Sequence, residues 1–569
     1  MKFPSIDSRR ETSLARALAA ATLILVAAVG AAAESPRVVG YYGSWGIYVR
    51  DYHVAEIPAA DLTHLDYAFV DVSAAGECAL ADPWADVQKP YAGDGGGPVR
   101  GNFRQLQILK AAQPHLKTLL ALGGWTLSAH FSDAALTPAS RQHLAQSCVA
   151  MMATYGFDGL DVDWEFPVSG GLAGNTMRPE DRQNFTALLA ALRAELDARA
   201  AIDGRPYLLT AAIPAPPGLH ANYELDQIHT HVDWLSIMAY DLHGPWSPIT
   251  HFHAPLFAPD DDPPWESDGL SGDAAVSAFL TAGVPADKIV LGLPFFARAW
   301  KQVPGSNAGL FQSHGGVPPG TYDEAGVLDY RDVAANYLPT YSRFWHPQSL
   351  SPWLYHPVNQ IMITYDDPES IAAKADYVAA RNLGGLMFWE LALDDDQHTL
   401  VNAIAGNLQA NCPDSPPTCD APGRSTIALR TGDHPRLSWT FSKGTVARAP
   451  EDFGNPTATT TYALCFYSGS QRVGQVKVAP VAGWRPLTSG YAYKARDGIR
   501  KILVKGGDAG KPRVVVSGIG AAVPALTTPL SEPFALTIAL VPDEGEACAA
   551  ATFTAATKNV AGNLRARLP

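Results

Sequence analysis

Short apolar runs alternate with longer amphipathic segments between about residue 36 and residue 410. Eight of these runs have the length of a buried strand and are rich in Val, Ile, Leu, Tyr and Phe. The segments between them show helical periodicity, as residues 179–199 do. The expected strands are residues 37–43, 64–70, 117–124, 156–165, 207–214, 232–240, 288–296 and 384–390.

This alternation predicts an α/β fold, a (β/α)8 TIM barrel with insertions that spans residues 34–410. A doubly wound open sheet is the alternative arrangement of the same elements. No Gly-rich phosphate loop follows the first strand, which weakens the nucleotide-binding form of that alternative.

Three further regions are predicted from length and composition. The seventh and eighth strands are too far apart for one crossover, so residues of about 300–365 are expected to form an inserted α+β domain with its own small sheet. Residues 411–425 have the Pro, Cys and polar residues of a linker. Short β-type runs between Gly and Pro then predict a C-terminal all-β domain, sandwich-like, over residues 426–569.

The N-terminus has the pattern of an export signal. Basic residues precede an uncharged apolar segment from Ala17 to Ala33, which ends in three alanines before Glu34. A retained membrane anchor is the alternative, but the segment is short for a spanning helix. We therefore predict a signal peptide over residues 1–33 and a secreted chain, extracellular or periplasmic, with no membrane association after cleavage.

The net charge limits the classes of molecule that the chain is expected to bind, and the cysteine content bears on its disulfides. The formal net charge of -14 disfavours nucleic acid and fits a neutral substrate, although a local basic patch would be hidden in this sum. Six cysteines allow 15 complete pairings, so the sequence leaves the pattern open. The favoured pairs are Cys412 with Cys419 and Cys465 with Cys548. A monomer without metal or organic cofactor is expected.

A row of acids stands out at residues 157–167, FDGLDVDWEFP. Asp161, Asp163 and Glu165 alternate with apolar residues, so a strand would place the three carboxyl groups on one face. Clustered acids raise one another's pKa, so one can keep a proton near neutral pH and act as a general acid. We assign that role to Glu165, and to Asp163 the stabilisation of developing positive charge. A structural network and a hard-cation site are the alternatives.

Aromatic residues lie at the expected carboxyl ends of several strands, where a barrel of this type builds its active site. Core packing is the ordinary explanation of any one of them. Together with the acids they indicate a sugar-binding cleft, with rings that stack on sugars and carboxyl groups that bind hydroxyls. They are Tyr41 and Trp45 on the first strand, Trp125 after the third, Tyr240 in MAYD (238–241) after the sixth and Trp389 on the eighth.

The acid motif resembles the DxxDxDxE signature of family 18 glycoside hydrolases, the chitinases, at Asp158, Asp161, Asp163 and Glu165. Other stretches are similar to successive landmarks of that family, and together they cover residues 37 to about 410. They are LGGW (122–125, with Gly123 and Gly124), MAYDLHGPWS (238–247), GLPFFAR (292–298), YDD (365–367) and GGLMFWELALDD (384–395). The inserted segment resembles the α+β chitinase insertion domain, which forms one wall of the cleft.

This resemblance implies a fold, a substrate and a mechanism. The substrate is chitin or chitooligosaccharides, and the substrate's own 2-acetamido group acts as the nucleophile with overall retention. Glu165 would protonate the glycosidic oxygen and then activate water. Asp163 would orient the acetamido group and stabilise the oxazolinium intermediate, while Asp161 tunes Asp163. Tyr240 would bind the acetamido oxygen.

The resemblance also implies substrate contacts. Trp389 would form the floor under the distorted sugar, and Trp125 a stacking surface on the product side. Tyr41 would support the acids. Met238, Asp241, Trp246 and Arg298 would line the cleft. Ala121 stands where the family commonly has Ser, and Phe296 and Ala297 stand in PFFAR where the family has PFYGR.

Two other functions remain as alternatives. One is an endo-β-N-acetylglucosaminidase that acts on glycoprotein or peptidoglycan glycans, and the other is a non-catalytic chitin-binding lectin. Such lectins lack the acid, and Glu165 is present here. In the tail, the aromatic residues are explained either by a chitin-binding face or by an ordinary β core. They are Trp439, Trp484, Tyr491 and Tyr493.

Overall fold

The computed structural model describes residues 36–568, apart from 266–267, 323, 410–411, 414, 432–434, 459, 479–482, 496–497, 520–529, 531–533, 543–544 and 546. The predicted signal peptide, residues 1–33, lies outside the described residues. Within the described part, no helix has both the length and the apolar character that a membrane span requires.

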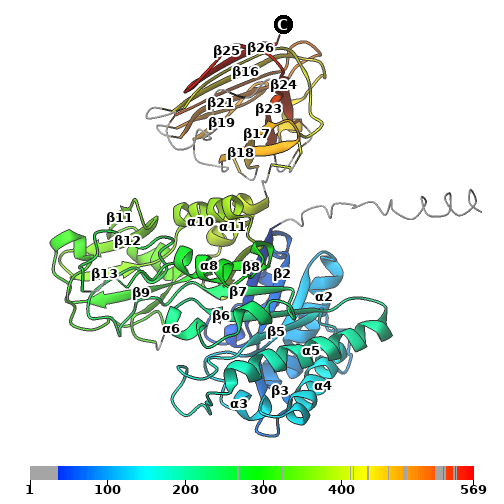
Figure 1. Ribbon diagram of the computed structural model, residues 1–569, viewed down its shortest axis with the longest axis vertical. Coiled ribbons are helices and arrows are strands. Elements are labelled where there is room, and N and C mark those ends of the chain that lie inside the picture. The colour runs from blue at the N-terminus through cyan, green and yellow to red at the C-terminus, as the bar shows by residue number, and fades with distance from the viewer. Residues whose placement is uncertain are drawn as a thin grey trace, which may run out of the picture. The chain divides into compact units, whose positions relative to one another are not determined.

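Eight parallel strands form a closed barrel (Figure 1). Strand β1 pairs with β14 on one side and with β2 on the other, which closes the sheet and excludes the open doubly wound alternative. The TIM-barrel prediction is confirmed. The barrel strands are β1 (Arg37–Gly43), β2 (His64–Val72), β4 (Lys117–Gly123), β5 (Gly159–Asp163), β6 (Leu208–Pro214), β7 (Trp234–Met238), β8 (Ile289–Pro294) and β14 (Gly385–Trp389). The short β3 (Cys78–Leu80) pairs antiparallel with β2.

The barrel helices begin and end where local chemistry favours it. Thr137 caps α4 by accepting a hydrogen bond from the Ser140 backbone N–H, and Gly156 ends that helix with a positive φ of 82°. The helices are α2 (Gly101–Ala112), α3 (Phe131–Ala134), α4 (Pro138–Tyr155), α5 (Asp181–Asp203), α6 (Pro217–His220), α7 (Leu225–Ile228), α8 (Gly272–Thr281), α10 (Pro368–Arg381) and α11 (Thr399–Gln409).

Alternate strand residues point into and out of the barrel. Outward residues such as Leu160 and Val162 join the large core under the helices. Inward residues form a separate, smaller core that includes Tyr41, Ala121 and Trp234. Side chains therefore fill the barrel, and polar groups at its carboxyl end rest on this packed interior.

The predicted insertion is a five-stranded antiparallel sheet between β8 and β14. Its strands run in the order β10-β9-β13-β12-β11. One face packs on the barrel core through residues such as Leu354, while the other carries Trp353 and Met362 in a core of its own. The elements are β9 (Phe296–Lys301), β10 (Val327–Asp329), the single-turn α9 (Tyr330–Asp332), β11 (Ser342–His346), β12 (Ser351–His356) and β13 (Ile361–Thr364).

The C-terminal region is all-β, as predicted, with an eight-stranded and a four-stranded sheet around its own core. The larger sheet contains β15 (Pro422–Arg430), β16 (Arg436–Gly444), β19 (Trp484–Leu487), β20 (Gly490–Lys494), β21 (Ile499–Lys505), β22 (Arg513–Ile519), β25 (Ala556–Val560) and β26 (Asn563–Leu568). The smaller contains β17 (Tyr462–Ser468), β18 (Gln471–Val478), β23 (Leu536–Pro542) and β24 (Ala549–Phe553). Trp439 and Trp484 lie within the core, and Tyr491 and Tyr493 pack against it, which favours the core explanation of these aromatics.

Both favoured cysteine pairs are wrong. The disulfides join Cys412 to Cys465 and Cys419 to Cys548, and a third joins Cys78 to Cys148 in the barrel. The physical reason is the folding of the small sheet. Cys465 points to the face of β17 on which Cys412 packs, whereas the backbone of Asp420 bonds to that of Cys548. Each half of the segment 411–425 is thus fastened separately to the β domain.

Candidate active site

Strand β5 holds the acid row as the alternation predicts. Asp161 and Asp163 are buried and point into the barrel, and Glu165 follows the strand and is partly exposed. On the opposite face, Trp164 is buried and stacks on Phe131, with ring centroids 5.3 Å apart. Apolar packing on one face therefore fixes the direction of the acids on the other.

Two hydroxyl groups donate hydrogen bonds to the carboxyl group of Asp161. Its Oδ2 accepts a hydrogen bond from the Tyr41 hydroxyl at 2.7 Å, and its Oδ1 accepts one from Thr210 at 2.5 Å. Burial raises the pKa of Asp161, and these two hydroxyls oppose the rise. Tyr41 thus supports the row from β1, as the sequence predicts, and Thr210 is a partner that the sequence reasoning missed.

The carboxyl group of Asp163 has fewer hydrogen-bond partners than that of Asp161 among the described residues. Burial raises its pKa well above the usual range, and the charges of Glu165 and Asp161 raise it further. Its buried Oδ1 has no hydrogen-bond partner among the described residues. In the substrate-free protein the proton is therefore favoured on Asp163 and the negative charge on Asp161, whereas our sequence interpretation assigned the charge to Asp163.

Glu165 keeps its proton at neutral pH. Burial raises the pKa of its carboxyl to about 8, and the charge of Asp241 contributes to the rise. The Glu165 backbone N–H donates to Ser128 Oγ at 2.9 Å, and the same hydroxyl donates to the Gly124 carbonyl. Ser128, which sequence reasoning also missed, thus links the loop after β4 to the acid.

Gly123 and Gly124 allow this close approach. Both have positive φ angles, 98° and 76°. A Cβ on Gly123 would lie 2.4 Å from the Asp163 carbonyl oxygen, and one on Gly124 would lie 2.4 Å from the Phe69 ring. The two glycines are therefore required for packing beside the acid row.

Asp158 lies at the start of β5, away from the acid row. It forms ion pairs with Lys110 at 2.6 Å and Arg205 at 2.9 Å, and it accepts the Thr118 backbone N–H. Burial alone would raise its pKa, but these partners outweigh that effect and lower it. The first acid of the motif is thus a structural residue that fastens β5 to its neighbours.

Aromatic rings gather beside the acids, as the sequence predicts. Trp389 stacks on Phe69 with centroids 5.5 Å apart, and Tyr41 lies 5.5 Å from Trp389. Trp45 lies 6.0 Å from Trp389 and 6.2 Å from Phe69. Because Trp45 and Trp389 remain partly exposed, they offer ring surface to a ligand at this end of the barrel.

Two more of the predicted site tryptophans are exposed, Trp125 at 47% and Trp246 at 60%. The edge of Trp125 faces Phe166, at a centroid distance of 6.5 Å. The Arg298 guanidinium lies 5.5 Å from the Trp246 ring. Large exposed rings are costly in water, so their presence here suits a stacking surface for sugars.

The segment after β7 supplies Asp241 and Tyr240, and β9 supplies Arg298. Arg298 binds Asp241 with two hydrogen bonds, at 2.7 and 2.8 Å. Burial would raise the pKa of Asp241, but His253 and Arg298 outweigh it and lower the pKa to about 2. Tyr240 has a pKa raised by burial and by the charges of Asp163 and Glu165. Met238 packs against the inward core.

Asp66 is a fourth buried acid that sequence reasoning missed. It points into the barrel from β2 and is fully buried, and neither carboxyl oxygen has a hydrogen-bond partner among the described residues. Burial raises its pKa well above the usual range, with the charge of Asp161 adding to the effect. An Asp in the middle of a mostly apolar strand was the available signal.

Replacing Asp66 with Asn is expected to raise the melting temperature at pH 8, with a gain that fades toward about pH 4. The folded-state pKa is raised, so folding above about pH 4 must take up a proton that Asn does not need. Asp158→Asn is the control and should lower the melting temperature at pH 8, because the ion pairs of Asp158 lower its pKa and stabilise the fold when it is ionised. Melting curves across this pH range test both, and a gain for Asp66→Asn that is independent of pH contradicts the assignment.

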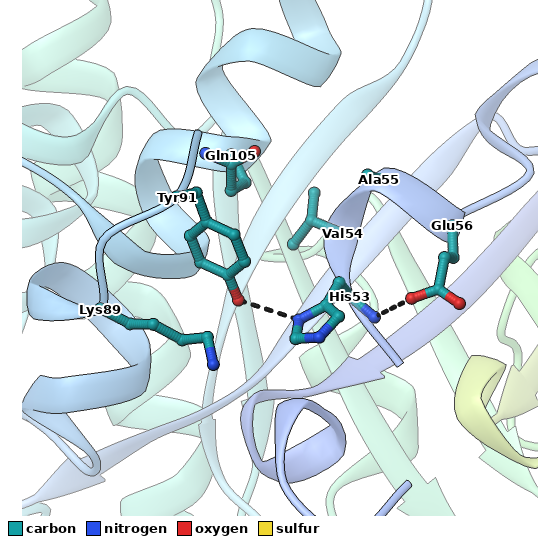
Figure 2. Close-up of a pocket in the computed structure, with 7 residues that line it drawn as sticks. All are labelled: His53, Val54, Ala55, Glu56, Lys89, Tyr91 and Gln105. Carbon is teal, nitrogen blue, oxygen red and sulfur yellow. Dashed lines mark hydrogen bonds between the residues drawn. The ribbon is translucent and has the colours of Figure 1, made fainter. Parts of the chain in front are cut away.

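A surface pocket of about 350 Å³ lies apart from this site and is lined by His53, Val54, Ala55, Glu56, Lys89, Tyr91 and Gln105 (Figure 2). None of the predicted site residues lines it. Its polar groups bind one another: the His53 ring bonds to the Tyr91 hydroxyl at 3.0 Å, and the backbone N–H of His53 donates to the Glu56 carboxylate. Few polar groups therefore remain for a ligand.

The hard-cation alternative finds no support in the arrangement of ligands. Across the residues that the structure describes, no three or more His, Cys, Asp or Glu side chains are grouped so as to hold a metal ion. The Asp161 carboxyl instead accepts hydrogen bonds from two hydroxyl groups.

A closed barrel that gathers carboxyl groups on one strand, with exposed aromatic rings at the same end, is the arrangement of a glycoside hydrolase. The comparison with protein families then gives the particular family. The model of glycosyl hydrolases family 18 matches residues 37–394, so the chain belongs to that family. The predictions of the family and of a glycoside hydrolase are confirmed.

Similar proteins extend the match beyond the barrel. Chitinase A1 of Niallia circulans is 40% identical over 462 residues, which cover 74% of this chain and 65% of that protein. The chain thus spans slightly less than two thirds of that relative's length. A chitinase structure from Bacillus thuringiensis is 30% identical with a TM-score of 0.64, and the match covers 89% of this chain and 88% of that one. A family 18 N-acetylglucosaminidase structure from Paenibacillus barengoltzii is 34% identical with a TM-score of 0.56, covering 65% of this chain and 99% of that one.

Proposed function

We propose that this chain is an exported chitinase that hydrolyses β-1,4-linked N-acetylglucosamine polymers with retention at the anomeric carbon. Glu165 is the general acid and base, and the substrate's 2-acetamido group is the nucleophile. The observation that carries the proposal is the position of Glu165. It is partly exposed at the end of the strand that holds Asp161 and Asp163, and its carboxyl has a pKa of about 8.

The reaction takes two steps. First, the acetamido oxygen bonds to the anomeric carbon of its own sugar while the glycosidic C–O bond breaks, and Glu165 gives its proton to the leaving oxygen. The oxazolinium ion that forms is positively charged, so ionised Asp163 stabilises it and Tyr240 holds its oxygen. Water then attacks the anomeric carbon and gives a proton to Glu165, which restores the amide and the acid.

Early-time NMR of a chitin hexamer tests this mechanism. We expect new reducing ends to appear first as the β-anomer, because attack by the acetamido group and then by water inverts the carbon twice. Products that appear first as the α-anomer would exclude the acetamido route. Binding without any product would instead favour the lectin alternative.

Whether the enzyme cuts within the polymer or from its end is a separate question, because one similar structure is named an N-acetylglucosaminidase. We propose chain cleavage within polymers, because the exposed rings of Trp125 and Trp246 suit several sugar subsites. Product lengths separate the alternatives: an endo-acting enzyme gives oligomers of several lengths early, whereas an N-acetylglucosaminidase that acts from the chain end releases monomers from the start. Release of N-glycans from a glycoprotein would favour the endo-β-N-acetylglucosaminidase alternative.

Export and monomeric state belong to the same proposal. Three disulfides among the described residues suit an oxidising compartment such as the periplasm or the exterior of the cell. Chitin is the partner, and the acid row and the aromatic rings need no second subunit.

The pH profile should reflect the proton on Glu165. Activity requires this proton, so kcat/KM is expected to fall as pH rises through about 8. Asp241→Asn removes a negative charge that raises this pKa and frees the Arg298 cation, so the basic limb should move to lower pH. Hydrolysis of a chitin tetramer from pH 5 to 10 measures the shift. Trp246→Phe, which removes no charge, is the control, and an equal shift in it would contradict the explanation.

A further inference from the structure

The outer face of the larger C-terminal sheet carries basic residues without acidic ones. On its strands, residues such as Trp439 and Val516 point into the core, and their neighbours point outward. None of the eight strands contains Asp or Glu. The outward, exposed cations form what we name the basic face: Arg424, Arg430, Arg436, Arg485, Lys494, Lys501, Lys505, Arg513, Lys558, Arg565 and Arg567.

The register of this sheet places like charges directly opposite each other. The pairs are Arg430 with Arg436, Lys505 with Arg513, Lys494 with Lys501, and Lys558 with Arg565. Directly opposed like charges destabilise a sheet. In the described part of the chain, no salt bridge joins the basic face to an acid. Among the described residues, the basic face therefore has no ion pair that would offset its repulsion, which points to a partner outside the chain.

The positive charge is local to this region. Residues 411–569 contain 18 Lys and Arg against 11 Asp and Glu, whereas the whole chain contains 42 against 56. The C-terminal region is thus positive in a protein with a net charge of -14. Such asymmetry gives the basic face a field that attracts anions despite the overall charge.

A groove of about 360 Å³ lies on the same face. It is lined by Arg424, Ser425, Thr426, Thr440, Ser442 and Arg513. Ser442 stands in register between Arg424 on one neighbouring strand and Arg513 on the other, so the two arginines lie about 10 Å apart across the groove. The side chains of Thr426, Thr440 and Ser442 form its floor between two guanidinium groups.

This geometry suits a ligand that carries both hydroxyls and regularly spaced anionic groups. A guanidinium binds a carboxylate or sulfate group with two parallel hydrogen bonds, and the Thr and Ser side chains can bind sugar hydroxyls. We propose that the basic face binds a linear anionic polysaccharide with carboxylate or sulfate groups. Bound in this way, the enzyme is retained in an acidic glycan matrix close to its neutral substrate.

Other polyanions fit the face less well. Single-stranded nucleic acid requires rings on which bases stack, and the aromatic side chains of these strands belong to or pack on the core. A lipid surface is bound through large apolar side chains, and the exposed ones among the described residues of this domain are Val446 and Val560. Two disulfides in this domain also suit a location outside the cytosol.

Retention of the full-length protein on immobilised heparin and alginate tests the proposal, with neutral dextran as the blank. The sulfated and carboxylated glycans should retain the wild type at low salt and release it as salt rises. Arg424→Gln/Arg513→Gln should weaken binding to the better of the two glycans at least about tenfold, because each arginine makes charged hydrogen bonds. Its rate on a chitin hexamer should be unchanged.

Lys443→Gln/Lys511→Gln is the matched control, since it removes the same charge from exposed lysines outside the basic face. If the lysine variant lost as much glycan affinity as the arginine variant, net charge alone would explain the binding, and the proposal would be overturned. No retention on either glycan would overturn it as well. So would tighter binding to duplex DNA or to anionic vesicles, or a salt-sensitive dimer in light scattering that the arginine variant abolishes. These readouts do not depend on hydrolysis, so they remain decisive if the proposed chitinase activity fails.

Discussion

Replacing Glu165 with Gln is expected to lower kcat on a chitin hexamer by about 10³-fold, because a general acid and base contributes roughly 10²- to 10⁴-fold. Gln has nearly the same shape but cannot give a proton to the leaving oxygen or accept one from water. The Ser128 hydroxyl binds the backbone N–H at this position, so the main chain should keep its place. Single-turnover hydrolysis followed by chromatography of the products measures the loss.

The control for this variant is its stability. The folded-state pKa of Glu165 is raised to about 8, so wild-type stability is lost as pH rises from its ordinary pKa of about 4.5 through that value. Gln does not ionise, so Glu165→Gln should melt no lower than the wild type at pH 8 and should still bind the hexamer. Residual hydrolysis within tenfold of the wild type would show that another group is the acid.

The barrel was predictable because each of its strands carries a local signal. A buried parallel strand reads as a short apolar run, and eight of them between helical segments leave few arrangements. The observed ends differ by a few residues: β5 begins at Gly159 and not at residue 156, because Gly156 and Phe157 still donate to the Met152 carbonyl at the end of α4. Closure was the part that the pattern could not decide, since it depends on the pairing of β1 with β2.

The acid row was predictable for the same local reason, but its partners were not. Alternation on one strand placed Asp161, Asp163 and Glu165 on one face. The hydroxyl of Thr210 and the carboxyl of Asp66 come from other strands, and no local pattern connects them with β5. Ala121 supplies no hydroxyl to Asp161, its partner in register, and Thr210 and Tyr41 occupy both carboxyl oxygens instead.

The disulfides show why nearness in sequence misleads. Cys412 and Cys419 would close a short loop, yet each pairs with a cysteine far along the chain, at separations of 53 and 129 residues. Chain entropy favours short loops, but the sheet fixes where each cysteine lies, and the fixed geometry decides. Pairings that fasten one segment to distant strands of the small sheet are therefore available only once the fold is known.

Replacing Asp163 with Asn is expected to lower kcat by about 10²- to 10³-fold while KM changes little, a magnitude typical of lost electrostatic stabilisation. In the free protein the raised pKa favours a proton on Asp163, whereas Asp161 has two hydroxyl donors for a negative charge. The positive oxazolinium reverses this preference, so Asp163 gives its proton to the ionised carboxylate of Asp161 and becomes negatively charged as the intermediate forms. Asn cannot ionise, and the cation then lacks its counter-charge.

Asp66→Asn is the matched control, because it makes the same change to another buried acid of the barrel whose oxygens have no partner among the described residues. We expect it to keep kcat within a few-fold of the wild type, since it reaches Asp163 only through the field of the barrel interior. Steady-state kinetics of both variants on a chitin tetramer provide the comparison. If both lose activity equally, the barrel needs its buried acids as a group; if neither does, the stabilising charge comes from elsewhere. A loss confined to Asp163→Asn places the counter-charge at Asp163, the carboxyl group whose pKa burial, Glu165 and Asp161 all raise.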